Sequence, residues 1–238
     1  MLKMQTQKQL LSEQYPYRIE LHAHTNPTSG CSEVTPEHLC QVYKELGFDA
    51  VVVTNHFFRW TEDGDAFLDS YMNAYERFRR CAVEMGLQPI FGAEIRFTEN
   101  SNDYLLYGVN RQMLKEIFEL LPYGVENFRK NYAFDGVFVQ AHPFRNNMES
   151  VPPEILDGIE VYNMHPNHNS RIGIAAQYAK DNKLKIRIGG SDYHHPHLDH
   201  EGLAVMRTRT LPMDTFGLAQ ILKEGDYLFE FGDALLLP

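Results

Sequence analysis

The stretch RIELHAHTN, residues Arg18 to Asn26, decides how the rest of the chain is interpreted. Its apolar-leaning run ends in His22 and His24, which are separated by one small residue. Because successive side chains of a strand alternate between faces, both imidazoles project to the same side. The stretch therefore predicts a strand that ends in two histidines able to bind one metal ion. An isolated pair of this kind is more often structural, so the rest of the chain must decide.

The bulk composition indicates a soluble globular protein. The chain has 238 residues, 43% of them hydrophobic and 23% charged, which suits one domain with a full core. Its 22 basic and 32 acidic residues give a net charge of −10, which argues against an extended nucleic-acid-binding surface. Cys31, Cys40 and Cys81 lack CxxC spacing, so they indicate neither a disulfide framework nor a cysteine zinc site. With no run resembling a signal peptide or a membrane span, we expect a cytoplasmic protein without a membrane partner.

Strands and helices alternate after a polar N-terminal extension, residues 1–16. We expect strands at 18–22, 50–54, 89–95, 104–109, 136–141, 158–162, 185–189 and 203–207. Helices are expected at 36–47, 65–85, 111–121, 127–132, 170–182 and 214–224. Alternation without sequence repeats is typical of a parallel sheet, and seven or so units indicate an α/β protein with a closed or nearly closed barrel. The barrel is expected to form a single domain over residues 17–238.

Polar side chains follow six of the expected strands, and in β/α barrels the active site lies where strands end and loops begin. The residues at these ends are His22 and His24, Asn55 and His56, Glu94, His142, Asn163 with Glu160 before it, and Asp192 with His194. Asp192 and His194 repeat the two-residue spacing of the first pair. Imidazoles with a few carboxylates indicate divalent zinc, manganese or iron at a catalytic site.

Five short motifs also resemble those of a known family. They are HAHT (22–25), TNH (54–56), GAE (92–94), AHP (141–143) and GSDYH (190–194). In this order they resemble the PHP domain, the polymerase and histidinol phosphatase superfamily. The resemblance extends from residue 18 to the C-terminal strand. It implies a distorted (β/α)7 TIM-like barrel with two or three metal ions at the strand ends, and phosphoesterase activity.

The resemblance also implies ligand roles, residue by residue. The ligands of a first metal would be His22, His24, Glu94 and Asp192. Glu94 would bridge to a second metal with His142, and His56 with His194 would serve a third. The chain departs from the family pattern at Asn55, where aspartate is usual, and in the loop TSGCS (28–32), where an acidic residue or histidine is often found. Near the expected strand 104–109, Asp103 and Tyr104 are the nearest candidates for a further ligand.

These observations predict a metal-dependent phosphoric ester hydrolase that acts on a small phosphorylated substrate, such as a nucleotide or histidinol phosphate. A metal-activated hydroxide would attack the ester. His194, where it is not a ligand, or His195 would protonate the leaving group. Arg59 and Arg145 lie shortly after two histidine motifs, where a guanidinium could bind phosphate. The ester, the metal and the oligomeric state stay open.

Two other functions also stay open. A metal-dependent amidohydrolase uses a similar HxH strand and a late aspartate, but on an eight-stranded barrel, and no plausible strand-end lysine is found in this chain. The other is a non-catalytic, metal-stabilised barrel that binds a ligand. An open cavity beside the metal ligands would argue for the enzyme. A role in polymerase proofreading is disfavoured because the chain has no long basic track.

Overall fold

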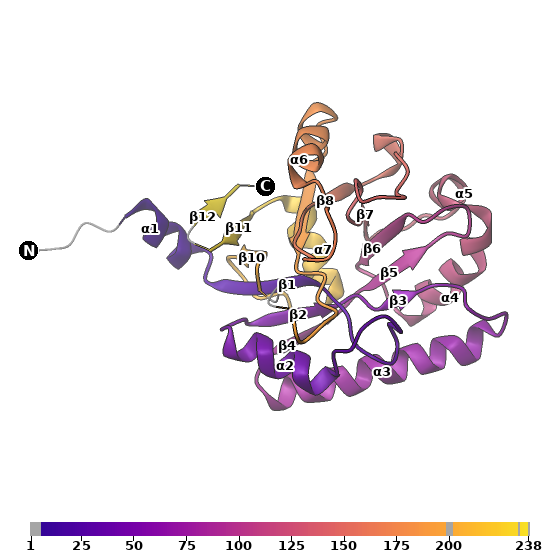
Figure 1. Cartoon of the computed structure of the whole chain (residues 1–238), viewed down its shortest axis with the longest axis horizontal. Helices are drawn as coiled ribbons and strands as arrows, with labels where there is room; N and C mark the ends of the chain where they lie inside the picture. The colour runs from indigo at the N-terminus through magenta and orange to yellow at the C-terminus, as the bar shows by residue number, and fades with distance from the viewer. Residues whose placement is uncertain (1–5, 199–201, 233, 238) are drawn as a thin grey trace, which may run out of the picture.

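The computed structural model describes residues 6–198, 202–232 and 234–237. Its strands form two mixed sheets (Figure 1). The first has the order β12-β11-β10-β1-β2-β4 and consists of β1 (Tyr17–Ala23), β2 (Ala50–Val53), β4 (Gln88–Phe91), β10 (Val205–Thr208), β11 (Tyr227–Phe231) and β12 (Ala234–Leu236). The second has the order β3-β5-β6-β7-β8-β9 and consists of β3 (His56–Phe57), β5 (Ala93–Arg96), β6 (Asp103–Tyr107), β7 (Val137–Gln140), β8 (Gly158–Asn163) and β9 (Ile186–Gly190).

The sequence predicts a parallel sheet in a distorted (β/α)7 barrel that is closed or nearly closed, whereas the structure has two mixed sheets and does not show a closed barrel. β1, β2 and β4 are parallel, and so are β7, β8 and β9. β6, however, runs antiparallel to both of its neighbours, β5 and β7. The reason is the short connection 97–102 between β5 and β6, since parallel neighbours need a crossover of a dozen or more residues. Strands β10 to β12 are antiparallel as well, and an isolated parallel bridge joins Ala23 of β1 to Tyr193, three residues beyond β9.

Seven helices are found in the described part of the chain. They are α1 (Gln7–Gln14), α2 (Pro36–Glu45), α3 (Gly64–Glu84), α4 (Arg111–Leu120), α5 (Val125–Asn131), α6 (Ile172–Asp181) and α7 (Thr215–Glu224), with short 3-10 turns η1 (Leu121–Tyr123) and η2 (Pro153–Ile155). Figure 1 shows α2 and α3 along one side of the molecule and α6 on the opposite side. In the described part of the chain, no helix has the length and apolar character required to cross a membrane.

Local signals fix where these helices begin. Thr35 caps α2 by accepting a hydrogen bond from the backbone of His38, and Pro36 takes the first helical position. Asp63 caps α3 in the same way. The expected N-terminal extension contains helix α1, whose residues are all at least partly exposed. Residues 1–5 of that extension lie outside the described residues.

A hydrophobic layer between the two sheets forms the central core. Residues from both sheets meet there, including Ile19, Val52, Ile90, Leu105, Val139 and Ile188. Leu218 and Leu222 of α7 belong to the same cluster. Burial of each large aliphatic side chain stabilises the fold by roughly 1.5–3 kcal/mol. The core therefore holds the strands together and sets the polar residues at their ends around one rim.

Candidate metal centre

The first histidine of the first motif, His22, lies where β1 departs from regular pairing with β2, between Glu20 and Ala23, and His24 directly follows the strand. Both imidazoles are buried, and their ring centroids are 4.9 Å apart. Gly190 at the end of β9 allows that strand to pass close to His22. A Cβ atom at that position would lie 2.4 Å from the Cβ of His22. Glycine is thus required where the end of β9 crosses the end of β1.

Unusual backbone conformations direct two further side chains to the rim. His142 has φ of 30° and Asp192 has φ of 52°, in the left-handed region that residues other than glycine seldom adopt. Hydrogen bonds hold both conformations. The backbone N–H of His142 donates to Glu160 at 2.9 Å, and that of Asp192 donates to the carbonyl of His22 at 2.8 Å. Strained backbone of this kind is concentrated at functional sites.

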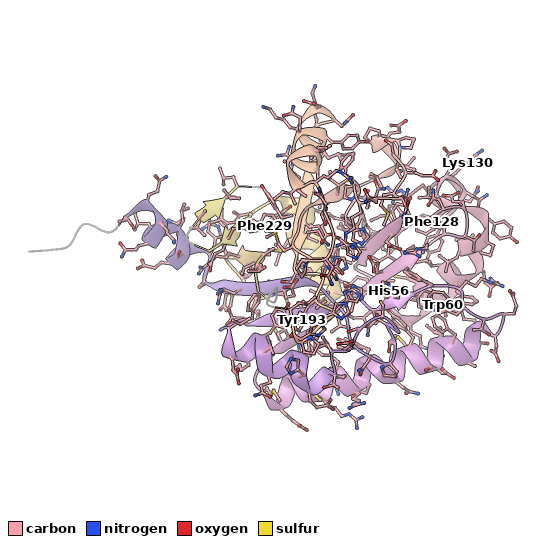
Figure 2. The ribbon with its side chains drawn as sticks, in the orientation of Figure 1. His56, Trp60, Phe128, Lys130, Tyr193 and Phe229 are labelled. Carbon is pink, nitrogen blue, oxygen red and sulfur yellow. The ribbon has the colours of Figure 1, made fainter. Side chains whose placement is uncertain are left out.

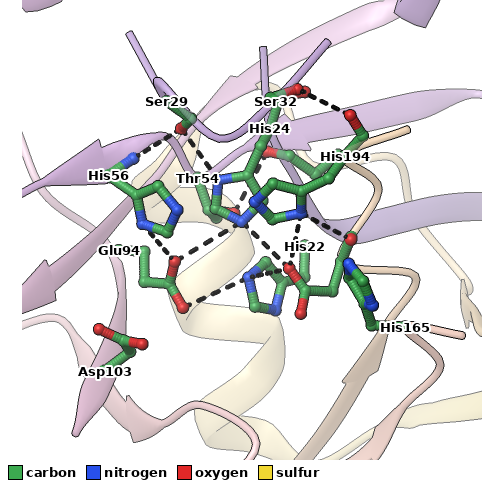
Figure 3. A network of polar contacts seen from close by, with 12 residues as sticks. His22, His24, Ser29, Ser32, Thr54, His56, Glu94, Asp103, His165 and His194 are labelled. Carbon is green, nitrogen blue, oxygen red and sulfur yellow. Dashed lines mark hydrogen bonds and ion pairs between the residues drawn. The ribbon is translucent and has the colours of Figure 1, made fainter. Parts of the chain in front are cut away.

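Four buried side chains form a first cluster (Figure 3). His22 Nε2 and His24 Nε2 each lie 3.4 Å from Asp192 Oδ1. The two oxygens of Glu94 lie 3.5 Å from His22 Nε2 and 3.6 Å from His24 Nε2. Ligands about 2.0–2.1 Å from a tetrahedral ion are separated by roughly 3.3–3.4 Å. The spacing of this cluster is therefore that of atoms that share one metal ion.

The hydrogen bonds around the cluster test whether these residues fit a metal. His22 Nε2, His24 Nε2 and Glu94 Oε2 are buried and make no hydrogen bond with any residue the structure describes. Such atoms are costly unless a bound ion or water satisfies them. The other ring nitrogens do have partners, because His22 Nδ1 lies 2.8 Å from Glu160 and His24 Nδ1 lies 3.1 Å from Ser29. Each Nε2 can then present its lone pair, so the residues fit a divalent ion.

The carboxylates of this cluster are ionised. Burial raises the pKa of Asp192, but Arg145 and then His22 outweigh this effect and hold it well below its usual range. Burial also raises the pKa of Glu94, which His56, His142 and His22 together bring well below the ordinary value. Both groups are consequently available as anionic ligands at neutral pH.

A second cluster consists of Glu94, His142 and Asp103. His142 Nε2 is 3.2 Å from Glu94 Oε1 and 3.9 Å from Asp103 Oδ2. Two hydrogen bonds from Arg96, of 2.7 and 2.8 Å, hold the carboxylate of Asp103 in place. Glu94 therefore lies between the first and second clusters, and Asp103 can serve as a ligand of the second.

The third cluster brings together His24, His56 and His194. His56 Nδ1 lies 2.9 Å from Glu94, and His194 Nδ1 lies 2.9 Å from the carbonyl of Asp192. Cys31, which the sequence did not mark, has its sulfur 3.2 Å from His56 Nε2. Burial raises the pKa of Cys31, but hydrogen bonds to His194 and His56 outweigh this and bring it to about 6.

Asn55, which stands where the family usually has aspartate, does not point at these clusters. Its Oδ1 accepts hydrogen bonds from the backbone of Thr25 at 2.7 Å and from the hydroxyl of Ser29 at 3.1 Å. Its Nδ2 donates to the hydroxyl of Thr25. Asn55 thus holds the loop after β1 against the end of β2.

A cavity of about 660 Å³ opens over the three clusters. His56, labelled near the centre of Figure 2, lines it together with Arg145 and His195. Arg145 makes hydrogen bonds to Asp192, Asn163 and Ser170. The positively charged guanidinium of Arg145 is therefore held in a fixed position in the cavity, beside the first cluster.

Arg59, the other expected phosphate ligand, is not among the described residues that line the cavity. Its guanidinium pairs with Glu62, lies 3.8 Å from Glu119 and packs on the ring of Phe118. The loop after His56 carries this side chain away from the site, so the structure does not place it for phosphate binding.

Sequence reasoning missed several residues that line the cavity. Arg96 follows Glu94 by two positions in β5, so the alternation of a strand would have placed it on the same face. His165 and His168 also line the cavity, but they lie in a turn-rich loop whose sequence has no periodicity to mark them. Burial lowers the pKa of His165 to about 3 although Asp192 opposes this shift, so this imidazole is neutral at pH 7.

Comparisons with known proteins agree with the motifs. A family model of the PHP domain matches residues 20–207. The structure is similar to that of a two-domain protein from Bacteroides vulgatus that contains a predicted PHP-like metal-dependent phosphoesterase, with a TM-score of 0.61 and 17% identity. The likeness covers 92% of this chain but 66% of that longer chain.

Two further likenesses have TM-scores below 0.5, too low to bear on the fold. One is to a candidate metal-dependent phosphoesterase from Bifidobacterium adolescentis, with a TM-score of 0.47 and 18% identity over 76% of this chain and 89% of that chain. The other is to an amidohydrolase from Chromobacterium violaceum with bound sulfate and no metal, with a TM-score of 0.48 and 15% identity over 77% of this chain and 89% of that chain. No protein with a curated description matches the chain in sequence. The family model spans most of the chain and coincides with all five motifs, so the chain belongs to the PHP domain family.

Proposed function

We propose that this chain hydrolyses the phosphate ester of a small molecule with the help of two or three divalent metal ions. The supporting observation is the first cluster, whose four buried ligand groups have metal-ligand spacing and lie beneath an open cavity. A cavity of about 660 Å³ is in the range that accommodates small molecules.

The three clusters divide the metal ligands between them. The first ion would be held by His22, His24, Glu94 and Asp192, the second by Glu94, Asp103 and His142, and the third by His56 and His194. When bound, divalent ions act as Lewis acids toward phosphoryl oxygens and lower the pKa of a coordinated water. Zinc, manganese and iron all suit this set of nitrogen and oxygen donors.

Arg96 and Arg145 explain how a chain with a net charge of −10 can accept an anion. Both line the cavity, and both are held by neighbouring side chains, Arg96 by Asp103 and Arg145 by Asp192 and Asn163. A guanidinium fixed in this way loses little conformational entropy when it donates hydrogen bonds to phosphoryl oxygens. These arginines would orient the ester for in-line attack.

His195 is our proposed proton donor for the leaving group. It lines the cavity, its side chain is 24% exposed, and its Nδ1 lies 3.8 Å from a carboxylate oxygen of Glu33. A histidine placed at the edge of a site can donate a proton as the ester bond breaks. His194 lies deeper, with its Nδ1 against the carbonyl of Asp192, which favours a role as ligand.

Two observations support a phosphoesterase over the alternatives. No lysine is found among the described residues that line the cavity, whereas the amidohydrolase alternative needs one at a strand end. The cavity is open beside the ligand clusters, which a purely metal-stabilised binding barrel does not require.

The test is phosphate release from a panel of phosphomonoesters, with and without added manganese or zinc, alongside a panel of amides. We expect metal-dependent release of phosphate, and its loss in the double variant His22→Ala, His24→Ala. Activity that survives exhaustive metal removal, or that is unchanged in the double variant, would contradict the proposal.

A further inference from the structure

The loop between β1 and α2, residues 24–35, is fixed on both sides of the third cluster. On one side, Ser29 accepts a hydrogen bond from the backbone N–H of His56 at 3.0 Å. On the other, the hydroxyl of Ser32 lies 3.3 Å from the carbonyl of His194, and the backbone N–H of Glu33 donates to the same carbonyl at 2.9 Å. Figure 3 shows both serines beside the imidazoles. The segment between them is therefore held over the gap between His56 and His194.

Cys31 lies in this segment, and its thiol lines the cavity together with the two imidazoles. Its sulfur is 3.2 Å from His56 Nε2. A thiolate about 2.3 Å and an imidazole nitrogen about 2.1 Å from one tetrahedral ion are separated by roughly 3.6 Å. The observed distance differs from this by a few tenths of an ångström, which a small rotation of the side chain would supply.

The orientation of both imidazoles agrees with this arrangement. Nδ1 of His194 lies 2.9 Å from the carbonyl of Asp192. Nδ1 of His56 lies 2.9 Å from Glu94 Oε2, although these two atoms do not form a hydrogen bond. Histidines that bind metals commonly direct one nitrogen at such an acceptor and the other at the ion. Nε2 of each ring is consequently the nitrogen available to an ion, and for His56 it is the one that faces Cys31.

We propose that Cys31 is a metal ligand, whose thiolate completes a site with His56 and His194. The thiol proton passes to solvent when the ion binds. A sulfur donor makes this position favour zinc, cobalt or cadmium over manganese or magnesium. The inference rests on metal binding by the centre described above, and it is independent of hydrolysis.

The other cysteines have different surroundings. Cys40 is buried in the apolar cluster between α2, α3 and the first sheet. Cys81 lies on α3, where its sulfur is 3.6 Å from a carboxylate oxygen of Glu37. Neither is among the described residues that line the cavity, so Cys81→Ser provides a matched control.

The experiment loads the full chain with cobalt(II) and records its absorption. Wild type and Cys81→Ser should show sulfur-to-cobalt charge transfer in the near ultraviolet, whereas Cys31→Ser should lose that band and bind one ion fewer by elemental analysis. The same band and the same metal content in Cys31→Ser would overturn the proposal.

A second measurement uses the unsubstituted protein, so it does not depend on how a variant folds. Alkylation by iodoacetamide, mapped by mass spectrometry, should be slower at Cys31 once zinc is bound, with no change at Cys81. Equal rates at Cys31 with and without zinc would contradict thiolate ligation. If these signatures are found in a protein that releases no phosphate, the proposed function fails while Cys31 remains a ligand.

Discussion

The substitution Glu160→Gln tests a residue that orients a metal ligand without being a ligand itself. Glu160 is buried in β8 and is not itself among the described residues that line the cavity. One carboxylate oxygen lies 2.8 Å from His22 Nδ1. The other accepts hydrogen bonds from the backbone of His142 at 2.9 Å and from Asn163 at 3.0 Å. This one carboxylate therefore orients two imidazoles that belong to different clusters.

An amide at this position cannot reproduce both sets of contacts. If the amide oxygen accepts the proton of His22, its NH2 group faces two other donors, the backbone N–H of His142 and the amide of Asn163. If the amide is turned over, its NH2 group faces His22 Nδ1. The proton of His22 must then move to Nε2, which can no longer bind a metal.

Both outcomes weaken the first metal site. Loss of a supporting carboxylate of this kind typically lowers metal affinity by about 10–100-fold, or roughly 1.4–2.8 kcal/mol. A buried donor left without an acceptor also lowers the free energy of unfolding of the metal-free protein by about 1–3 kcal/mol.

The assay is competition for zinc against a chromogenic chelator, in wild type and Glu160→Gln. Glu154→Gln, an exposed substitution in η2, serves as the matched control and should bind zinc like wild type. Equal zinc affinity of Glu160→Gln and wild type, with the fold intact by circular dichroism, would refute the reasoning.

Three more predictions follow from the same contacts. Removal of metal by a chelator should lower the melting temperature by roughly 5–11 °C, relative to protein in a free metal concentration one hundred times the Kd. An unchanged melting curve would mean that the clusters bind no ion. His195→Gln should slow the hydrolysis of alkyl phosphates by about 10²–10⁴-fold. It should slow the hydrolysis of 4-nitrophenyl phosphate much less, because a good leaving group needs no proton donor, and equal slowing of both esters would exclude His195 as the donor. Tyr43→Phe removes a 2.9 Å hydrogen bond to the buried carboxylate of Glu20 and should lower the free energy of unfolding, measured in urea, by about 1.5–3 kcal/mol. Tyr123→Phe, at an exposed position, should leave the free energy of unfolding unchanged.

Sequence periodicity predicted most of the elements but not how they are joined into sheets. The expected strand 89–95 is in fact β4 and β5, which lie in different sheets and separate at Gly92. A Cβ atom at Gly92 would lie 3.0 Å from side-chain carbons of Thr54 and Val52, so a larger residue there would force these side chains to shift. The reversal of β6 was foreseeable from the short connection before it, since no helix fits in residues 97–102.

The candidate site was predictable where a strand ends in a ligand, because the carboxyl ends of parallel strands meet at one edge. His22, His142 and Asp192 lie at such ends and come together in the structure, although their roles as ligands stay predictions. Asp103 begins its strand, and the reversal of β6 brings that beginning to the same rim. Cys31 lies in a loop whose course depends on distant hydrogen bonds, which periodicity does not reveal.

The position of Glu94 between the clusters has a consequence for how the protein responds to metal supply. Its oxygens approach His22 and His142 on one side, and His24 and His56 on the other. An ion that draws on this carboxylate leaves less negative charge for the next, so the ions repel and bind in separate stages. If the proposed ions bind in this way, the molecule would be partly loaded over a wide span of free metal concentration, and the proposed hydrolysis would be graded by the ions around it.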